Sequence, residues 1–317
     1  MRIVFAGSPA PAVPTLDALV AAGHEVVAVV TRPDAPVGRK RVLTPSAVAA
    51  AAEDRGLPVI RAARLDAEAT ERIRATDPEL GVIVAYGGLV REPLLSAPVH
   101  GWINLHFSAL PAWRGASPVQ RSIAHRSGAG ATVFQLVPAL DAGPVWVSRE
   151  RALTGEETAG MLLEELAVSG AVDVLAAVDA IASGETPTEQ VGEPSFAPKL
   201  DAADGRIDWS RDRIDVVAQI RAMTPEPGAH TTVDGTRVKV LVVEREPAAE
   251  IPTGTGGDPV TALPAGTVTA RSGAVVVGTG TDPVRLVTVQ PAGKTQMDAE
   301  SWWRGLGRRT DGEVEAS

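Results

Sequence analysis

The first 31 residues, MRIVFAGSPAPAVPTLDALVAAGHEVVAVVT (Met1–Thr31), contain the pattern that decides the fold class. Arg2–Ala6 is a short apolar run that ends at a Gly-Ser-Pro turn, as a buried strand does. Ala12–Ala22 has apolar residues at helical spacing and is followed by Gly23, a common C-terminal helix cap. Glu25–Thr31 is a second apolar run, rich in valine. The segment therefore predicts a strand, a helix and a second strand.

The same alternation continues through the first half of the chain. Ser46 is placed to cap an Ala-rich helix that ends near Gly56, and a long helical pattern runs from Glu156 to Ser183. Further strands are predicted at Gly81–Tyr86, Trp102–His106 and Thr132–Val137. Strands that alternate with helices are typical of an α/β domain with a doubly wound, mostly parallel sheet. We assign this domain to residues 1–184.

The composition of the sequence and the pattern of predicted elements change after Gly184. Residues 185–206 are rich in Pro, Gly and charge, and we expect them to form a linker packed over a surface. Residues 207–310 contain one helical pattern and several short strands with turn residues between them, which predicts a small OB-like β-barrel. The elements expected there are a helix at Arg211–Met223 and strands at Val238–Val243, Gly266–Ala270, Ala274–Val277 and Arg285–Val289. We expect a flexible loop at Glu246–Pro264 and a disordered acidic tail at Asp311–Ser317.

Composition narrows the class of protein. No run of about 18 apolar residues indicates a membrane-spanning helix, and the N-terminus lacks the parts of a secretion signal. The chain has no cysteine, which excludes disulfides, thiolate chemistry and cysteine-ligated zinc. We expect a cytoplasmic protein without membrane contacts that acts as a monomer. The net charge of −9 argues against a polyanion partner, but RNA binding depends on local basic residues, because screening limits the reach of distant charges.

The candidate chemistry lies in NLHFSALPAWRGASP (Asn104–Pro118), which leaves the C-terminal end of a predicted strand. Open α/β sheets bind ligands at this edge. Asn104 and His106 are two residues apart in an extended strand and should therefore point to the same face. An amide can stabilise a developing oxyanion and an imidazole can carry a proton, so this pair suits acyl transfer.

Asp141 lies in Ala-Leu-Asp-Ala-Gly, just after the strand predicted at Thr132–Val137. If the ends of the two strands are adjacent, its carboxylate would orient the His106 ring and favour its protonated form. Each residue alone also has an ordinary explanation, Asn104 and Asp141 as turn residues and His106 as a structural histidine. The combination of the three is what favours catalysis.

The segment 104–118, followed by LDAGPV at 140–145, resembles the signature of the 10-formyltetrahydrofolate-dependent formyltransferases. Other stretches resemble the members of that family that act on methionyl initiator tRNA. These are MRIVFAGSPAPAVPTLDAL (1–19), TRPDAPVGRKRVLTPS (31–46), VIVAYG (82–87), SFAPKLDAADGRIDWS (195–210) and VQPAGKTQM (289–297). The resemblance implies a Rossmann-like formyltransferase domain and a barrel that binds tRNA. The implied reaction transfers the formyl group of 10-formyltetrahydrofolate to the α-amino group of methionyl initiator tRNA, for translation initiation, without a metal.

The resemblance also implies roles for single residues. The catalytic residues are Asn104, His106 and Asp141. The residues that bind the folate are Tyr86, Ser108, Ala109, Leu110 and Pro111. The chain departs from the family pattern at Ala109, where leucine is usual, at Ala112, which is often basic, and at Pro138-Ala139, which replaces Val-Gly.

Basic residues that could contact RNA occur in the long loop Thr31–Ser46. Taken alone, Arg39, Lys40 and Arg41 are best explained as a solvated charged loop. The resemblance reverses this preference, because the matching loop reaches the tRNA acceptor end and Arg39 aligns with its key arginine. Lys199 is a further candidate, in the part of the chain that precedes the predicted barrel.

Three alternatives remain at this stage. The first is a folate-dependent formyltransferase acting on a small amine, such as glycinamide ribonucleotide or an amino sugar. The second is an RNA-binding module without catalytic activity, although aromatic residues are only 3% of the chain, which disfavours a base-stacking surface. The third, a nucleotide-cofactor oxidoreductase, is disfavoured because the first turn, Ala6–Pro11, lacks G-x-G-x-x-G.

Overall fold

The computed structural model describes residues 1–38, 40–244, 263–271, 273–307 and 312–317. The chain divides into two compact units. Unit 1 comprises Met1–Pro118, Gly128–Ala152 and Leu163–Pro198, and unit 2 comprises Val119–Ser127, Leu153–Leu162 and Lys199–Ser317. The helices α4 (Pro118–His125) and α5 (Ala159–Ala182) each contribute residues to both units.

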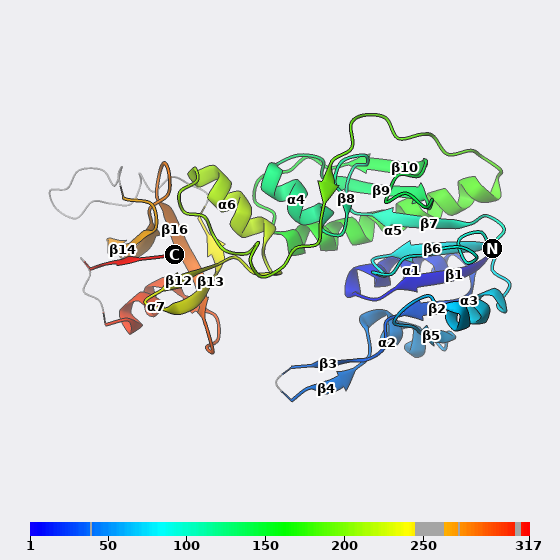
Figure 1. The fold of residues 1–317 in the computed structure, drawn as a ribbon, viewed down its shortest axis with the longest axis horizontal. Helices are drawn as coiled ribbons and strands as arrows, with labels where there is room; N and C mark the ends of the chain where they lie inside the picture. Colours follow the sequence, from blue (N-terminus) through cyan, green and yellow to red (C-terminus); the bar gives the residue numbers. More distant parts are fainter. Residues whose placement is uncertain (39, 245–262, 272, 308–311) are drawn as a thin grey trace. The chain divides into compact units, whose positions relative to one another are not determined.

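Unit 1 is built on a seven-stranded sheet with the strand order β10-β9-β7-β6-β1-β2-β5 (Figure 1). Its strands are β1 (Arg2–Gly7), β2 (Glu25–Thr31), β5 (Val59–Arg61), β6 (Leu80–Val84), β7 (Trp102–His106), β9 (Gly130–Gln135) and β10 (Val145–Glu150). The strands from β7 to β5 in this order run parallel, whereas β9 and β10 pair antiparallel. The predicted α/β fold with a mostly parallel sheet is confirmed.

Helices connect these strands and bury them. They are the short 3-10 helix η1 (Ala10–Ala12) and the α-helices α1 (Val13–Ala21), α2 (Ala47–Asp54) and α3 (Ala67–Arg74). Ser46 caps α2, as the sequence predicts, by accepting a hydrogen bond from the Ala49 amide at 3.0 Å. Asp66 caps α3 in the same way. Every residue of β6 is buried, as expected for a parallel strand with both faces covered.

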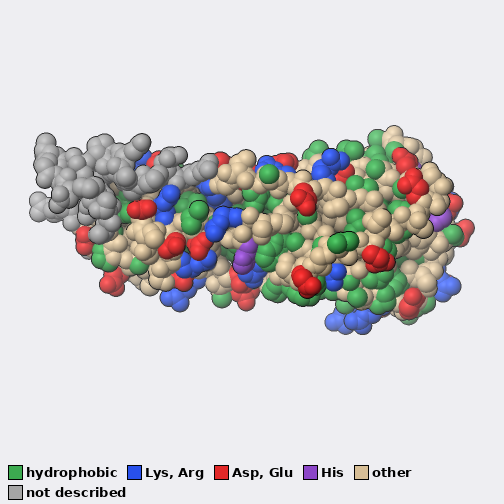
Figure 2. Space-filling model, turned by 90° about the horizontal axis from the view of Figure 1, so that it is seen from above, with side chains coloured by type: hydrophobic (Ala, Val, Ile, Leu, Met, Phe, Trp, Pro, Cys, Tyr) green, Lys and Arg blue, Asp and Glu red, His purple; other side chains and the backbone are tan. Residues whose placement is uncertain are grey.

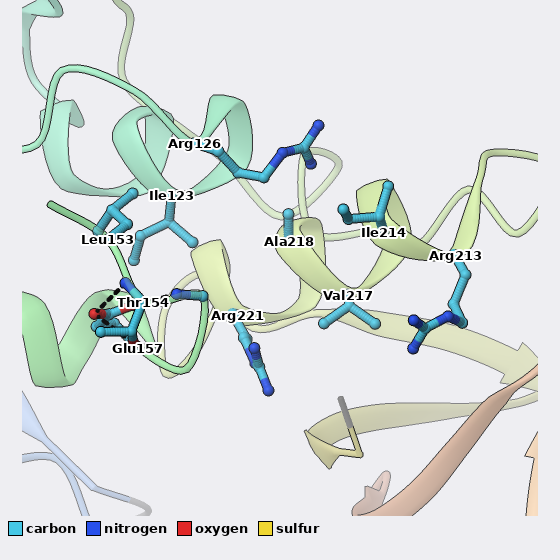
Figure 3. Close-up of a pocket in the computed structure, with 11 residues that line it drawn as sticks. Ile123, Arg126, Leu153, Thr154, Glu157, Arg213, Ile214, Val217, Ala218 and Arg221 are labelled. Carbon is cyan, nitrogen blue, oxygen red and sulfur yellow. Dashed lines mark hydrogen bonds between the residues drawn. The ribbon is translucent and has the colours of Figure 1, made fainter. Parts of the chain in front are cut away.

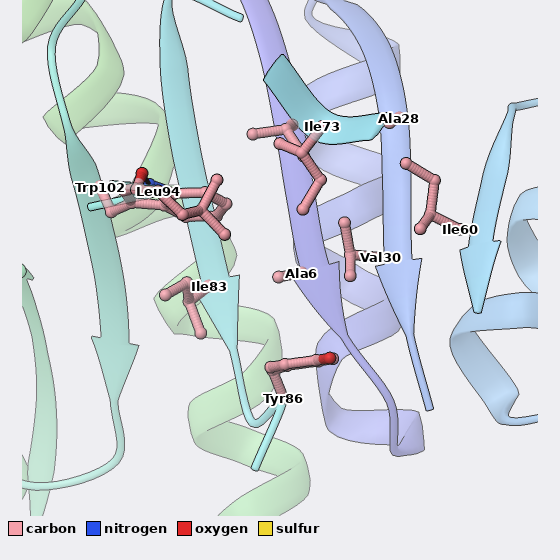
Figure 4. Close-up of a cluster of buried hydrophobic side chains, with 10 residues drawn as sticks. Ala6, Ala28, Val30, Ile60, Ile73, Ile83, Tyr86, Leu94 and Trp102 are labelled. Carbon is pink, nitrogen blue, oxygen red and sulfur yellow. Dashed lines mark hydrogen bonds between the residues drawn. The ribbon is translucent and has the colours of Figure 1, made fainter. Parts of the chain in front are cut away.

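The core of unit 1 contains a cluster of buried side chains from the sheet and from the segments between its strands, among them Tyr86, Leu94 and Trp102 (Figure 4). On β7, Leu105 contacts the helix α5, where Gly170 leaves room for it. A Cβ atom at Gly170 would lie 2.8 Å from the Leu105 methyl carbons. Because side chains alternate along a strand, α5 covers the face of β7 opposite to that of Asn104 and His106.

Unit 1 also contains two small two-stranded sheets, one antiparallel and one parallel. The loop predicted at Thr31–Ser46 contains the hairpin of β3 (Ala35–Val37) and β4 (Val42–Thr44). The strand β8 (Arg114–Gly115) pairs parallel with β11 (Phe196–Ala197). The first part of the predicted linker is therefore hydrogen-bonded into unit 1, up to Pro198.

Unit 2 contains a seven-stranded antiparallel sheet with the order β12-β13-β16-β15-β14-β18, with β17 paired to β16. Its elements are α6 (Arg213–Ala222), β12 (His230–Val233), β13 (Thr236–Val243), β14 (Thr267–Arg271), β15 (Ala274–Val277), β16 (Val284–Pro291), β17 (Met297–Asp298), α7 (Ala299–Gly305) and β18 (Glu313–Glu315). The sheet closes on itself. Val233, in the edge strand β12, forms a bridge with Ala316, which directly follows the other edge strand, β18. The predicted small β-barrel is confirmed.

The end of the chain corrects one expectation. The acidic tail Asp311–Ser317 is predicted to be disordered, but Glu313–Glu315 forms β18 and pairs with β14. Thr232 and Ser317 exchange two backbone hydrogen bonds of 2.8 and 3.0 Å. The tail is ordered because it pairs with two strands that would otherwise be sheet edges.

Two further expectations concern the loop after β13 and the absence of a membrane-spanning helix. The flexible loop expected at Glu246–Pro264 lies outside the described residues up to residue 262. Among the helices that the structure describes, none combines the length and the hydrophobicity that a membrane crossing requires.

Candidate active site

Asn104 and His106 lie on the same face of β7, as predicted, and pair with Phe134 and Thr132 of β9. His106 is 6% exposed, and its ring contacts Phe134 edge to face at a centroid distance of 6.4 Å. Asn104 is half-buried. Within the described part of the chain its carboxamide forms no hydrogen bond, so its donor and acceptor remain available to a ligand.

Asp141 reaches His106, as predicted, but not by the predicted route. Its Oδ2 atom lies 3.7 Å from His106 Nδ1. Because β9 runs antiparallel to β7, with Ile103 opposite Gln135, β9 ends at the edge of the sheet away from His106. The expectation that adjacent strand ends bring the two side chains together is therefore wrong. The loop of residues 136–144 carries the carboxylate back toward the imidazole.

A backbone amide holds the carboxylate of Asp141, and a glutamine holds the backbone of its loop. Its Oδ2 atom accepts a hydrogen bond of 2.8 Å from the Gly115 amide. The backbone at Asp141 has a φ of 45°, in the left-handed region that few non-glycine residues adopt. Gln190 donates from Nε2 to the carbonyl oxygens of Asp141 and Gly143, at 2.9 Å each. The position of Asp141 thus depends on contacts from other segments.

The hydrogen bonds of His106 define which nitrogen carries its proton. Nε2 lies 2.9 Å from the carbonyl oxygen of Trp113. A carbonyl only accepts, so Nε2 must donate, and Nδ1 of the neutral ring has its lone pair on the side of Asp141. Burial lowers the pKa of His106, and the Asp141 carboxylate and the Trp113 carbonyl oppose this effect. The ring is therefore neutral near pH 7, with a carboxylate placed to stabilise an added proton.

The turn Ser108–Pro111, predicted to bind folate, follows directly on β7. The Ser108 hydroxyl donates to the Ala112 carbonyl at 2.5 Å, and the Ala109 amide donates to the Gly128 carbonyl at 3.2 Å. The hydroxyl of Thr132, the residue opposite His106, donates to the Ser108 carbonyl and accepts from the Leu110 amide. These bonds fix the shape of the turn beside His106. Leu110 is buried, whereas Ala109 and Pro111 are half-buried.

Tyr86 is placed apart from these residues. Its side chain is 1% exposed and belongs to the core cluster of unit 1 (Figure 4). Its hydroxyl donates to the Ala62 carbonyl at 3.0 Å, and the Arg32 guanidinium lies 5.8 Å from its ring centroid. Burial raises the pKa of the phenol. In this position the ring packs behind the end of β6 and exposes almost no surface to a ligand.

The residues predicted to bind tRNA lie in two places. Lys40 and Arg41 are exposed at the turn of the β3–β4 hairpin in unit 1, and Lys199 is exposed at the beginning of unit 2. Arg39 lies outside the described residues. On the face drawn in Figure 2, Lys and Arg side chains stand among Asp and Glu side chains. Because the net charge is −9 and salt screens distant charges, basic side chains close to an RNA would matter more than the overall charge.

A separate cavity of about 480 Å³ lies within unit 2 (Figure 3). Ile123, Leu153 and Val217 supply apolar walls, and the Glu157 carboxylate accepts hydrogen bonds from the Thr154 amide and hydroxyl. Two arginines on its lining form ion pairs with carboxylates, Arg126 with Asp215 and Arg221 with Glu156. The charges of these two guanidinium groups are therefore balanced by carboxylates of the chain. None of the predicted site residues lines the cavity.

Sequence reasoning missed three residues that hold the predicted ones. Trp113 binds His106, Gly115 binds Asp141, and Gln190 binds the loop of Asp141. The first two lie in the segment 104–118, but they act through backbone atoms, which residue types do not reveal. Gln190 lies in the predicted linker, where neither spacing nor residue type distinguishes it. Among the described residues no group of His, Asp and Glu is arranged to hold a metal ion.

The sequence also matches known protein families. The family described as formyl transferase matches residues 1–177, and the family described as formyl transferase, C-terminal domain, matches residues 199–307. A methionyl-tRNA formyltransferase from Clavibacter sepedonicus is 55% identical over 310 residues, which cover 96% of this chain and 97% of that protein.

Solved structures share the fold at lower identity. HypX from Aquifex aeolicus in complex with tetrahydrofolic acid superposes with a TM-score of 0.62 and 19% identity, over 97% of this chain and 47% of HypX. An N-formyltransferase from Helicobacter canadensis, solved with folinic acid and dTDP-3-aminofucose, superposes with a TM-score of 0.64 and 16% identity, over 90% of this chain and 99% of that one. The sequence matches, which extend over both units, show that this chain belongs to the formyl transferase family, as does the methionyl-tRNA formyltransferase of C. sepedonicus.

Proposed function

We propose that this protein transfers the formyl group of 10-formyltetrahydrofolate to the α-amino group of methionyl initiator tRNA. The observation that carries the proposal is the cluster at the end of β7. There Asn104, whose carboxamide forms no hydrogen bond with any described residue, shares a strand face with an imidazole that lies 3.7 Å from the carboxylate of Asp141. High identity to a methionyl-tRNA formyltransferase over both units supports the choice of acceptor.

Asn104 would stabilise the charge that develops on the formyl oxygen. When the amine nitrogen attacks the formyl carbon, the carbonyl oxygen becomes negative. A half-buried amide donor with no competing bond in the described chain can meet this charge. His106 is less suited to this task through Nε2, because that proton is already donated to Trp113.

His106 and Asp141 would move the proton. The attacking amine becomes cationic and must lose one proton, and the departing folate nitrogen must gain one. The lone pair of Nδ1 can accept the proton from the amine, directly or through a water, and Asp141 stabilises the imidazolium that results. Return of this proton to the folate nitrogen releases tetrahydrofolate and formylated methionyl-tRNA, so the reaction consumes no net proton at the enzyme.

The folate donor would lie against the turn Ser108–Pro111, whose backbone is fixed beside His106 by the bonds to Thr132 and Gly128. The tRNA would contact Lys40 and Arg41 of the β3–β4 hairpin, Lys199 of unit 2, and Arg39, which lies outside the described residues. Lys40, Arg41 and Lys199 are exposed, and exposed basic side chains can contact phosphates without reading the bases.

The experiment that tests the proposal offers the purified protein formyl-labelled 10-formyltetrahydrofolate with several acceptors. These are methionyl initiator tRNA, uncharged initiator tRNA, glycinamide ribonucleotide and a nucleotide-linked amino sugar. We expect label only in methionyl-tRNA, and none with His106→Ala. Transfer to a small amine instead would replace the proposed acceptor, and no transfer to any acceptor would contradict the proposed enzyme.

A further inference from the structure

The position of Asp141 is not fixed by a helix or strand, because the residue lies in the loop 136–144. It lies in a loop beyond the end of β9, and its backbone has a φ of 45°. Non-glycine residues leave this conformation readily unless other contacts hold them. Since the carboxylate must lie beside Nδ1 of His106, whatever fixes this loop also fixes the geometry of the pair.

Gln190 is the side chain that fixes it. One amide group spans the loop, because Nε2 donates to the carbonyl oxygens of both Asp141 and Gly143 at 2.9 Å. The two protons of a primary amide match two carbonyl acceptors. Gly143 is itself confined, since a Cβ atom there would lie 1.8 Å from the Gln135 carbonyl oxygen. The amide therefore bridges the candidate carboxylate residue to a part of the loop that cannot move freely.

Arg114 orients this amide. Its Nη2 atom donates to Gln190 Oε1 at 2.7 Å. A guanidinium only donates, so Oε1 must face Arg114 and Nε2 must face the two carbonyls, and the opposite rotamer of the amide would lose all three bonds. Arg114 precedes Gly115, whose amide binds the Asp141 carboxylate. Both ends of Asp141, carboxylate and carbonyl, are thus tied to the strand β8.

The backbone around Gln190 is anchored on both sides. Thr188 and Val145 exchange backbone hydrogen bonds of 2.6 and 2.9 Å at the beginning of β10. After Gln190, the Ser195 hydroxyl accepts from the Trp113 amide at 2.9 Å, and β11 pairs with β8. The segment 188–197 therefore joins the loop of Asp141 to the loop that binds His106, within unit 1.

We infer that Gln190 is a positioning residue, which holds the Asp141 carboxylate against His106 through the two carbonyls of its loop. The inference rests on the proposed function, because it assumes that the His106–Asp141 pair moves the proton. It gives residues 188–197, near the end of unit 1 along the chain, a part in the reaction. On this inference Gln190 acts through Asp141, and its side chain does not itself contact the formyl donor or the tRNA.

Two substitutions at one position separate this role from simple packing. Gln190→Ala removes all three hydrogen bonds. Gln190→Glu keeps the size of the side chain and the bond to Arg114, but turns a carboxylate oxygen toward two carbonyl oxygens. We expect Gln190→Glu to lower kcat at least as much as Gln190→Ala, by roughly 10- to 100-fold, with the KM for 10-formyltetrahydrofolate nearly unchanged. Glu189→Gln, an exposed neighbour in the same segment, is the matched control and should keep the wild-type kcat.

A double-mutant cycle with Asp141→Asn tests whether Gln190 acts through Asp141. In the Asp141→Asn background, adding Gln190→Ala or Gln190→Glu should change the residual kcat by less than about twofold, since coupled residues do not add. Thermal unfolding of each variant shows that it is folded. Equal slowing by Gln190→Ala with and without Asp141, or a normal kcat in Gln190→Glu, would overturn the inference. If Asp141→Asn alone keeps the wild-type kcat, the proposed role of Asp141 fails first, and the inference fails with it.

Discussion

His106 Nδ1 and Asp141 Oδ2 lie 3.7 Å apart, although β7, which carries His106, and β9, which precedes the loop of Asp141, run in opposite directions. Both side chains are largely buried, with 7% and 11% of their surface exposed. In such an environment a carboxylate acts on its neighbour with little screening by solvent. The pair therefore combines two opposing influences on the imidazole, burial that disfavours its charged form and a carboxylate that favours it.

The first prediction concerns the pKa of His106 in Asp141→Asn. Burial already holds this pKa below the ordinary value of 6.5, and the carboxylate partly offsets burial. Removal of the negative charge should therefore lower the pKa further. NMR titration of the His106 ring protons measures the shift. His125, which lies in unit 2, should titrate as before. An unchanged or raised pKa of His106 would show that the carboxylate does not act on the ring.

The same pKa sets the pH dependence of the wild-type enzyme. If neutral His106 accepts the proton from the amine, kcat should be constant near pH 7 and fall only as the pH drops through the pKa of His106, below 6.5. Because the folded-state pKa is depressed, His106 also costs stability in that acidic range and none above it. A fall in kcat that begins well above pH 6.5 would point to another group.

The second prediction concerns Asn104→Ala. Since the carboxamide forms no hydrogen bond in the described part of the chain, its removal should leave the midpoint of thermal unfolding nearly unchanged. Loss of an oxyanion donor should lower kcat by about 10²–10³-fold. Steady-state kinetics and a thermal scan measure the two effects. A variant with normal kcat and a raised KM for the folate would assign Asn104 to binding alone.

How much of this site the sequence predicts depends on the range of the interactions. The strands Glu25–Thr31, Trp102–His106 and Ala274–Val277 have the predicted bounds, because apolar runs between turn residues are local signals. The shared face of Asn104 and His106 follows from the geometry of any strand.

The direction of β9 and the position of Gln190 could not be predicted in this way. Whether a strand pairs parallel or antiparallel depends on the path of the connection, which periodicity does not encode. The bonds of Gln190 to the loop of Asp141 join residues 49 and 47 positions apart, and their acceptors are backbone carbonyls, which every residue possesses. The tail was misjudged for a related reason, because Glu-Val-Glu is a strand only beside the edge that it completes.

A third prediction tests the close approach at Gly143. A Cβ atom there would lie 1.8 Å from the Gln135 carbonyl oxygen, so Gly143→Ala must displace the loop of Asp141. We expect the free energy of unfolding of unit 1 to fall by about 1–3 kcal/mol and kcat to fall with it. Urea unfolding and kinetics measure both. Gly305→Ala, where a Cβ atom would meet nothing within 4 Å, is the control and should be neutral or slightly stabilising.

A fourth prediction tests the β3–β4 hairpin as a tRNA contact. Arg41 is exposed there, so reversal of its charge should not disturb the core. Arg41→Glu should raise the KM for methionyl-tRNA, more strongly at low salt, and leave the KM for the folate unchanged. Arg72→Glu makes the same change of charge at an exposed position of α3 and serves as the control. Equal effects of both variants would mean that only the overall charge matters.

The last prediction concerns the end of the chain. Deletion of residues 312–317 removes β18 from β14 and the backbone bonds that join Ser317 to Thr232. It also removes the buried side chain of Val314. We expect a loss of about 2–4 kcal/mol from the stability of unit 2, and self-association through the two exposed strand edges. The control Glu313→Gln with Glu315→Gln keeps the pairing and removes the charge of the two exposed side chains. If the truncated chain has the same unfolding midpoint and the same apparent size in size-exclusion chromatography as this control, the tail does not close the barrel in solution. If the truncated chain alone is impaired, pairing of the strand edges, and not the negative charge of the tail, is what the barrel requires.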